Sequence, residues 1–191
     1  MSNKGIYSPK DTKFLMDMQQ FTRLGQLELI QTQTASSATN VDFTNLGNYN
    51  VHLLTVNNHT FPAGSQDYGI RLYENGVLET GTNYVWTYAQ QLSNASGSEL
   101  GETSRTSIAI QIEQPTGFNS GGYTYLYNLL DSTKYSVITN QHIRVSNSMI
   151  AEFGMDVLSQ ASLVDGFHIS GYDSSTPSFS GTLSLYGIRF A

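Results

Sequence analysis

The chain has 191 residues, which suits one domain large enough to bury a core. It contains no cysteine, which excludes disulfides, thiolate metal sites and a cysteine nucleophile. The net charge is −6 at pH 7, which argues against a nucleic-acid partner because phosphate contacts need a basic face. No apolar run approaches the roughly 18 residues that a membrane helix needs, and the first residues lack the apolar core of a signal peptide.

Charge is scarce and unevenly placed along the chain. Only 13 % of the residues are charged, and uncharged polar residues, 12 tyrosines and 9 phenylalanines stand in their place. Residues 1–24 carry four basic and two acidic residues, whereas the remainder carries five basic and thirteen acidic ones. Low charge reduces the solubility of a free monomer and matters less for a subunit of an assembly, so the composition favours an assembled protein.

The N-terminal stretch predicts one amphipathic helix over residues 9–24. Ser8 is a suitable N-cap, Pro9 occupies the first helical position, and Gly25 is a suitable stop. Its apolar side chains recur at helical spacing. They are Phe14, Leu15, Met18, Phe21 and Leu24. Two interpretations are open: the helix covers an end of the domain's own core, or it is an anchor that docks on a partner.

From Gly25 onward the pattern has a period of two and is rich in β-forming residues. Predicted strands cover 26–35, 39–46, 49–58, 67–76, 83–92, 106–115, 121–130, 134–147, 164–170 and 181–190. Residues 148–160 are ambiguous, and we assign them to a strand. The intervening segments carry turn residues, including Asn75-Gly76.

About ten short strands without helices between them predict an all-β fold, an antiparallel β-sandwich of the jelly-roll type. The domain organisation is then an arm over residues 1–24 and a β-sandwich over residues 25–191. The final alternating run, SFSGTLSLYGIRFA, is expected to be a core strand that pairs near QLELIQTQT, residues 26–34. Its deletion is expected to unfold the domain.

The sequence offers no catalytic or cofactor signature. There is no G-x-S-x-G, H-E-x-x-H, P-loop or G-x-G-x-x-G motif. The four histidines are far apart in sequence, and a metal site needs three or more ligands, so no metal and no cofactor are expected. Carboxylates from distant strands could still pair as in glycosidases; the candidates are Glu74, Glu79, Asp67 and Glu102. The expectation is that the chain is not an enzyme.

Two strands carry aromatic side chains on one face. Tyr84, Trp86 and Tyr88 alternate along the first, and the second spans residues 123–127 with tyrosine at every other position. Such a face is usually core or a subunit interface, and when exposed it can stack on sugars. Exposure of Trp86 beside amide side chains would favour a glycan platform, whereas burial would favour a structural role.

The order of these segments resembles small virion proteins of tailed bacteriophages, marine ones especially. The resemblance covers about residues 25–190. It rests on an opening L-x-L-I-x-T-x-T-A-S strand at residues 27–36 and an x-V-x-F-T-x-L strand that follows it. It also rests on a closing S-G-T-x-x-L-Y-G-I run at residues 180–188. These motifs are structural, and the arm over residues 1–24 departs from them.

The resemblance implies a non-enzymatic virion structural protein, an accessory subunit that decorates the capsid or attaches to the tail. The implied partners are copies of itself, most simply as a homotrimer, and other virion proteins such as major capsid or tail subunits. The implied location is the virion, assembled in the host cytoplasm. The alternative is a receptor- or glycan-binding module of a tail or head fibre that meets a host surface glycan.

Overall fold

The computed structural model describes residues 26–61, 66–114, 118–145, 149–172 and 178–188; side chains of 66–67 and 111–114 are not described. The predicted helix over residues 9–24 lies outside the described residues. Within them the structure has thirteen strands. The first seven are β1 (Leu27–Ala38), β2 (Asn40–Phe43), β3 (Val51–Thr60), β4 (Gln66–Glu74), β5 (Val77–Leu78), β6 (Tyr84–Leu92) and β7 (Ser98–Arg105). The others are β8 (Ile108–Gln114), β9 (Ser120–Tyr127), β10 (Tyr135–Val145), β11 (Met149–Ala161), β12 (Val164–Gly171) and β13 (Phe179–Ile188).

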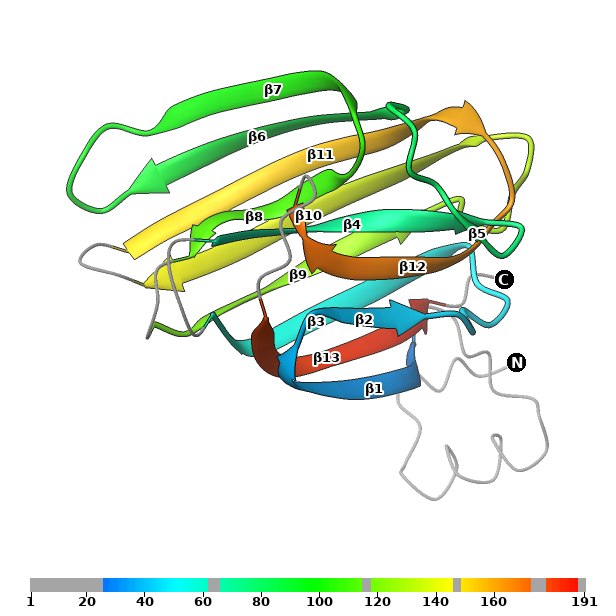
Figure 1. Cartoon of the computed structure of the whole chain (residues 1–191), viewed down its shortest axis with the longest axis horizontal. Helices are drawn as coiled ribbons and strands as arrows, with labels where there is room; N and C mark the ends of the chain where they lie inside the picture. Colours follow the sequence, from blue (N-terminus) through cyan, green and yellow to red (C-terminus); the bar gives the residue numbers. More distant parts are fainter. Residues whose placement is uncertain (1–25, 62–65, 115–117, 146–148, 173–177, 189–191) are drawn as a thin grey trace, which may run out of the picture.

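The strands form two packed antiparallel sheets, which confirms the predicted β-sandwich (Figure 1). The larger sheet has eight strands in the order β1-β13-β3-β9-β10-β11-β6-β7. The smaller sheet has the order β2-β12-β4-β5, with β8 also paired to β4. The ambiguous segment 148–160 contains β11, the longest strand, so its assignment to a strand is confirmed.

The final strand lies inside the larger sheet. β13 pairs with β1 on one side, from Leu27 opposite Ile188, and with β3 on the other, from Val51 opposite the same residue. The predicted pairing with residues 26–34 is therefore confirmed. Because β13 hydrogen-bonds to two neighbours, both strands would lose their partner if it were absent.

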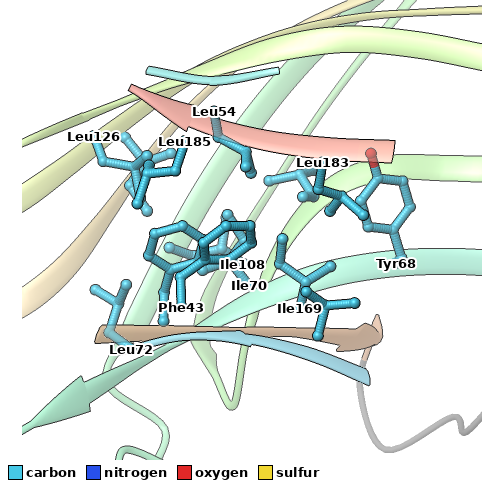
Figure 2. Packing of buried hydrophobic residues seen from close by; sticks show 14 of the residues in the cluster. Phe43, Leu54, Tyr68, Ile70, Leu72, Ile108, Leu126, Ile169, Leu183 and Leu185 are labelled. Carbon is cyan, nitrogen blue, oxygen red and sulfur yellow. The ribbon is translucent and has the colours of Figure 1, made fainter. Parts of the chain in front are cut away.

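The core fills the space between the two sheets. Phe43 and Phe167 of the smaller sheet stack with ring centroids 4.9 Å apart, and Leu54 and Leu185 face them from the larger sheet (Figure 2). In β12 and β13 apolar side chains alternate inward as a half-buried sheet requires. The turn between β4 and β5 is the predicted Asn75-Gly76 pair, with φ of 51° and 78°. Positive φ at both positions is the geometry that Asn-Gly hairpin turns supply.

Tyr84 connects the two sheets by hydrogen bonds. This fully buried side chain projects from β6, and its hydroxyl accepts a hydrogen bond from the backbone N–H of Leu72 in β4 at 2.9 Å. The same hydroxyl donates to the carbonyl of Glu79 at 3.3 Å. The contact holds the end of the smaller sheet against β6.

We expect Tyr84→Phe to lower the free energy of unfolding by about 1–3 kcal/mol, because the buried N–H of Leu72 would lose its acceptor. Urea unfolding followed by circular dichroism measures the change. The matched control is Tyr125→Phe, which removes a hydroxyl from the outward side of β9. Equal stability of Tyr84→Phe and the wild type would show that this contact between the sheets contributes nothing.

Candidate interaction surface

Two of the three aromatic residues singled out on β6 are buried. Trp86 is 4 % exposed and faces inward, where its indole N–H donates to the hydroxyl of Tyr172 at 2.9 Å. Tyr88 stacks beside it with ring centroids 5.5 Å apart, and Tyr84 is fully buried. Burial of Trp86 is the outcome that favours a structural role, because a covered indole cannot stack on a sugar. The anchor residues Phe14, Leu15, Met18, Phe21 and Leu24 lie outside the described residues.

The outward side of the larger sheet carries a continuous uncharged surface. One row of paired residues crosses six neighbouring strands; it consists of Tyr186, Leu53, Tyr125, Thr139, Met155 and Thr87. The next row along the strands consists of Ser184, Thr55, Tyr123, Gln141, Phe153 and Ala89. The row on the other side consists of Ile188, Val51, Tyr127, Val137, Val157 and Val85. We call these three rows the apolar face.

Large apolar side chains on this face are open to solvent. Met155 is 60 % exposed and Phe153 is 45 % exposed, both on β11. On β9, Tyr123 and Tyr125 meet edge to face at 5.7 Å, and Tyr125 and Tyr127 lie 6.2 Å apart. Exposed Ile143 and Met149 continue the surface beyond the rows. Extended exposed apolar patches mark interaction sites more often than ordinary solvent-facing surface.

The strands β10 and β11 reverse the usual distribution of polar and apolar side chains. Glu152 and Asp156 of β11 are 3 % and 2 % exposed, whereas the apolar residues between them face outward. In β10, Asn140, His142 and Arg144 are buried, and the residues that alternate with them face outward. Ile138, Ile150 and Leu158 also face inward, so these two strands place buried polar groups among apolar ones and leave large apolar side chains in solvent.

The outward side of the smaller sheet is an ordinary polar surface. Asp42 accepts hydrogen bonds from Tyr73 and His168, each at 2.7 Å, and from Asn40 at 2.8 Å. Partial burial would raise the pKa of Asp42, but the hydrogen bonds from Tyr73 and His168 outweigh it and hold the pKa below its usual value. The two outer sides of the sandwich thus differ in kind, and the apolar one is the candidate site.

Two shallow hollows indent the candidate surface. One, of about 510 Å³, lies between Phe153 and Met155 of β11 and the small residues Thr87, Ala89 and Gly101. The other, of about 360 Å³, lies above Gly121, with Tyr123 and Gln141 among its walls. The small residues at these positions leave room that a protruding side chain of a partner could fill.

The buried ionisable groups face away from this surface, into the sandwich. Burial lowers the pKa of His59 to about 4 and that of His142 to about 3, with the proximity of His59 adding to the second shift. Burial raises the pKa of Asp156 well above its usual value, against a smaller opposite effect of the hydrogen bond from Asn140. These groups lie within the core, which gives a substrate no route to them, so we assign them a structural role.

The carboxylates considered for catalysis have structural partners. Gln160 donates to both Glu74 and Glu79, at 2.6 and 2.9 Å, so the structure brings this pair together at the end of β4. Glu102 pairs with Arg105 at 2.9 Å, and the side chain of Asp67 is not described. Neither Glu74 nor Glu79 lines the hollows described above. The described part of the chain contains no cluster of three or more histidines and carboxylates that could hold a metal ion.

In the part of the chain that the structure describes, no helix has the length and apolar character to cross a membrane.

Comparison with known proteins identifies no family for this chain. No family model matches it, and no curated protein matches it. Among solved structures it is similar to a fructofuranosidase of Schwanniomyces occidentalis complexed with fructosylnystose. That similarity has 6 % identity and a TM-score of 0.40, over 86 % of this chain and 34 % of the other. The chain thus spans about a third of that protein's length.

Two further solved structures are more distant. A legume lectin-like domain from Entamoeba histolytica has 9 % identity and a TM-score of 0.25, over 87 % of this chain and 89 % of the other. The T=1 particles derived from infectious bursal virus have 10 % identity and a TM-score of 0.12, over 84 % of this chain and 39 % of the other.

Proposed function

We propose that this chain is a non-enzymatic structural protein of a bacteriophage virion, an accessory subunit that decorates the capsid or attaches to the tail. The observation that carries the proposal is the apolar face. An uncharged surface of this extent is unfavourable in a monomer and favourable in an assembly. The resemblance of residues 25–190 to small virion proteins supports a location in the virion. The absence of a catalytic motif in the sequence supports a non-enzymatic role.

The proposed partners are further copies of the chain, as a homotrimer, and a major capsid or tail subunit. The arm over residues 1–24 serves as the anchor to that subunit. A compact domain with a short anchor fits capsid decoration better than a fibre, which needs longer chains or repeats. Five apolar side chains on one anchor contribute roughly 1.5–3 kcal/mol each on burial, and several anchors on one oligomer act together.

The expected result of the test is that the full chain co-sediments with purified particles that lack it. The double variant Met18→Glu and Phe21→Glu is expected to remain folded and to stay in the supernatant, because charges on the apolar stripe oppose burial. Gln20→Glu is the control, because it adds a negative charge to the same arm and replaces none of its five apolar side chains. Circular dichroism confirms that each variant is folded.

Three outcomes contradict parts of this proposal. Equal binding of the wild type and the double variant would exclude the arm as the anchor. Failure of the wild type to bind any particle would exclude the virion role. Binding of the wild type to a glycan array, combined with no binding to particles, would instead support the receptor-binding alternative. The hollow beside Tyr123 and Gln141 is then the site to test, because an exposed ring beside an amide suits a sugar.

A further inference from the structure

The apolar face has two unlike halves, one on each side of β10. On one side, β9 presents the three tyrosines at positions 123, 125 and 127, and Tyr186 of β13 lies beyond them. On the other side, β11 presents Phe153 and Met155 toward β6. Figure 1 shows β10 between β9 and β11 in the middle of the larger sheet. We call these the tyrosine half and the methionine half.

The size of the apolar face matches what one subunit contributes to a stable interface. With the further row that exposed Ile143 continues, the surface spans six strands about 4.8 Å apart and about 8 residues at about 3.3 Å per residue, which is roughly 750 Å². A standard protein–protein interface takes about 800 Å² from each partner. If each copy gives one half of the face to each of two neighbours, its two contacts together cover an area of this standard size.

The charge distribution on the face favours a copy of the same chain as its partner. Within the three rows there is no Asp, Glu, Lys or Arg; Glu99 of the edge strand β7 lies opposite Ala89 of the second row and lines the hollow beside Phe153 and Met155. Two copies can therefore approach without like-charge repulsion, although the chain as a whole carries −6. A charged partner such as a nucleic acid or a basic protein would find no complementary charge here.

We propose that the apolar face is the contact between copies of this chain, with the methionine half of one copy packed on the tyrosine half of the next. The proposal rests on the proposed function for its assembled setting and names the partner of the face. A two-fold axis would pair the two unlike halves within one dimer, whereas a heterologous contact closes into a ring when the rotation between copies allows it. Thioether groups near aromatic rings make favourable contacts, so the two halves are chemically matched. Of these two arrangements we take the ring with three members, because it accords with the proposed homotrimer.

The first test is the molar mass of the full chain in solution by light scattering. We expect three times the 21.0 kDa of one chain for the wild type, and 21.0 kDa for Met155→Glu, because a carboxylate would be buried in the contact. Val77→Glu is the matched control, since Val77 is an exposed apolar residue of β5 in the smaller sheet, and its mass is expected to equal that of the wild type. A wild type that is monomeric, or a Met155→Glu variant that keeps the wild-type mass, would overturn the proposal.

The second test uses the absence of cysteine in the chain. Tyr125 and Met155 lie in the same row, two strands apart, with Thr139 between them. Their Cα atoms are therefore about 9.6 Å apart in one chain, which is too far for an internal disulfide. The double variant Tyr125→Cys and Met155→Cys is expected to give covalent trimers on oxidation. The covalent product would be a dimer if the contact were a two-fold one, and that result would overturn the ring of three.

The two proposals can fail separately. If the wild type is monomeric in solution and still binds particles through its arm, the contact between copies would be contradicted and the virion role supported. If the wild type is a trimer that Met155→Glu dissociates, but it binds no particles, the virion role would be contradicted and the contact between copies supported. If the wild type is monomeric and binds vesicles of neutral phospholipid, the partner of the face is a lipid surface and the inference is wrong.

Discussion

A chain that ends at Ser178 is expected not to fold. Removal of residues 179–191 deletes β13, whose Phe179, Leu183 and Leu185 are fully buried in the core. Burial of three such side chains contributes roughly 5–9 kcal/mol, which is comparable to the 5–15 kcal/mol by which most domains are stable. The strands β1 and β3 also lose their partner. Circular dichroism and limited proteolysis of the truncated chain would measure the loss.

A point substitution in β13 tests the role of the same strand without removing it. We expect Leu185→Ala to lower the free energy of unfolding by about 2–5 kcal/mol, because it leaves a cavity between the sheets. Tyr186→Phe, one position along and facing outward, is the control and is expected to change it little. If the truncated chain kept a cooperative unfolding transition, the larger sheet would be stable without its second strand, and our description of β13 as structural would be wrong.

Acid is expected to destabilise the protein before most carboxylates titrate. His59 and His142 have pKa values near 4 and 3 in the folded state, below the value of about 6.5 in an unfolded chain. The unfolded state therefore binds more protons below pH 6.5, and stability present above that pH is lost as the pH falls. The loss between pH 6.5 and pH 4 is on the order of 3 kcal/mol for each histidine.

The sign of the effect can be tested with two variants. His142→Gln is expected to show a smaller acid-induced loss than the wild type, because one histidine is gone while His59 and His52, whose pKa values burial also lowers, remain. Asp156 acts in the opposite direction, since its raised pKa makes the folded state bind more protons and so gains stability as the pH falls. Asp156→Asn is therefore expected to steepen the loss. Urea unfolding at a series of pH values measures both, and equal slopes for all three proteins would contradict the assignment.

Much of the fold could be predicted from the pattern of residues. Alternation in the final run predicted the core strand that became β13, whose Leu183 and Leu185 are buried, and the Asn75-Gly76 pair marked a turn. The strand β7 could not be predicted, because an edge strand that buries almost nothing leaves no alternation to detect. Turn residues and period-two burial are local signals, whereas an exposed edge strand is held only by its neighbour β6.

The candidate surface was harder to predict than the fold. Tyrosines 123, 125 and 127 were recognisable as one face, but the sequence does not say which side of the sheet meets the core. In β11 the ordinary rule places Glu152 and Asp156 in solvent and Phe153 in the core, which is the opposite of the observed arrangement. Which side of β11 faces the core is decided by the strands around it, and β6, which pairs with it on one side, lies far from it in sequence. The burial of Trp86 was equally hard to predict, because Tyr172, which accepts the hydrogen bond of its indole, lies 86 residues away in sequence.

The pairing of β1 with β13 also sets the order of events during synthesis. Leu27 lies opposite Ile188, so the larger sheet cannot close until the ribosome has released almost the whole of residues 27–188. Until then β1 and β3 lack their shared neighbour, and the outward rows of tyrosine and methionine are only partly assembled. Sheets closed by such distant strands fold slowly, and their incomplete forms are prone to aggregate. Co-translational chaperones are therefore expected to engage this chain, and only molecules that contain β13 would present the complete apolar face.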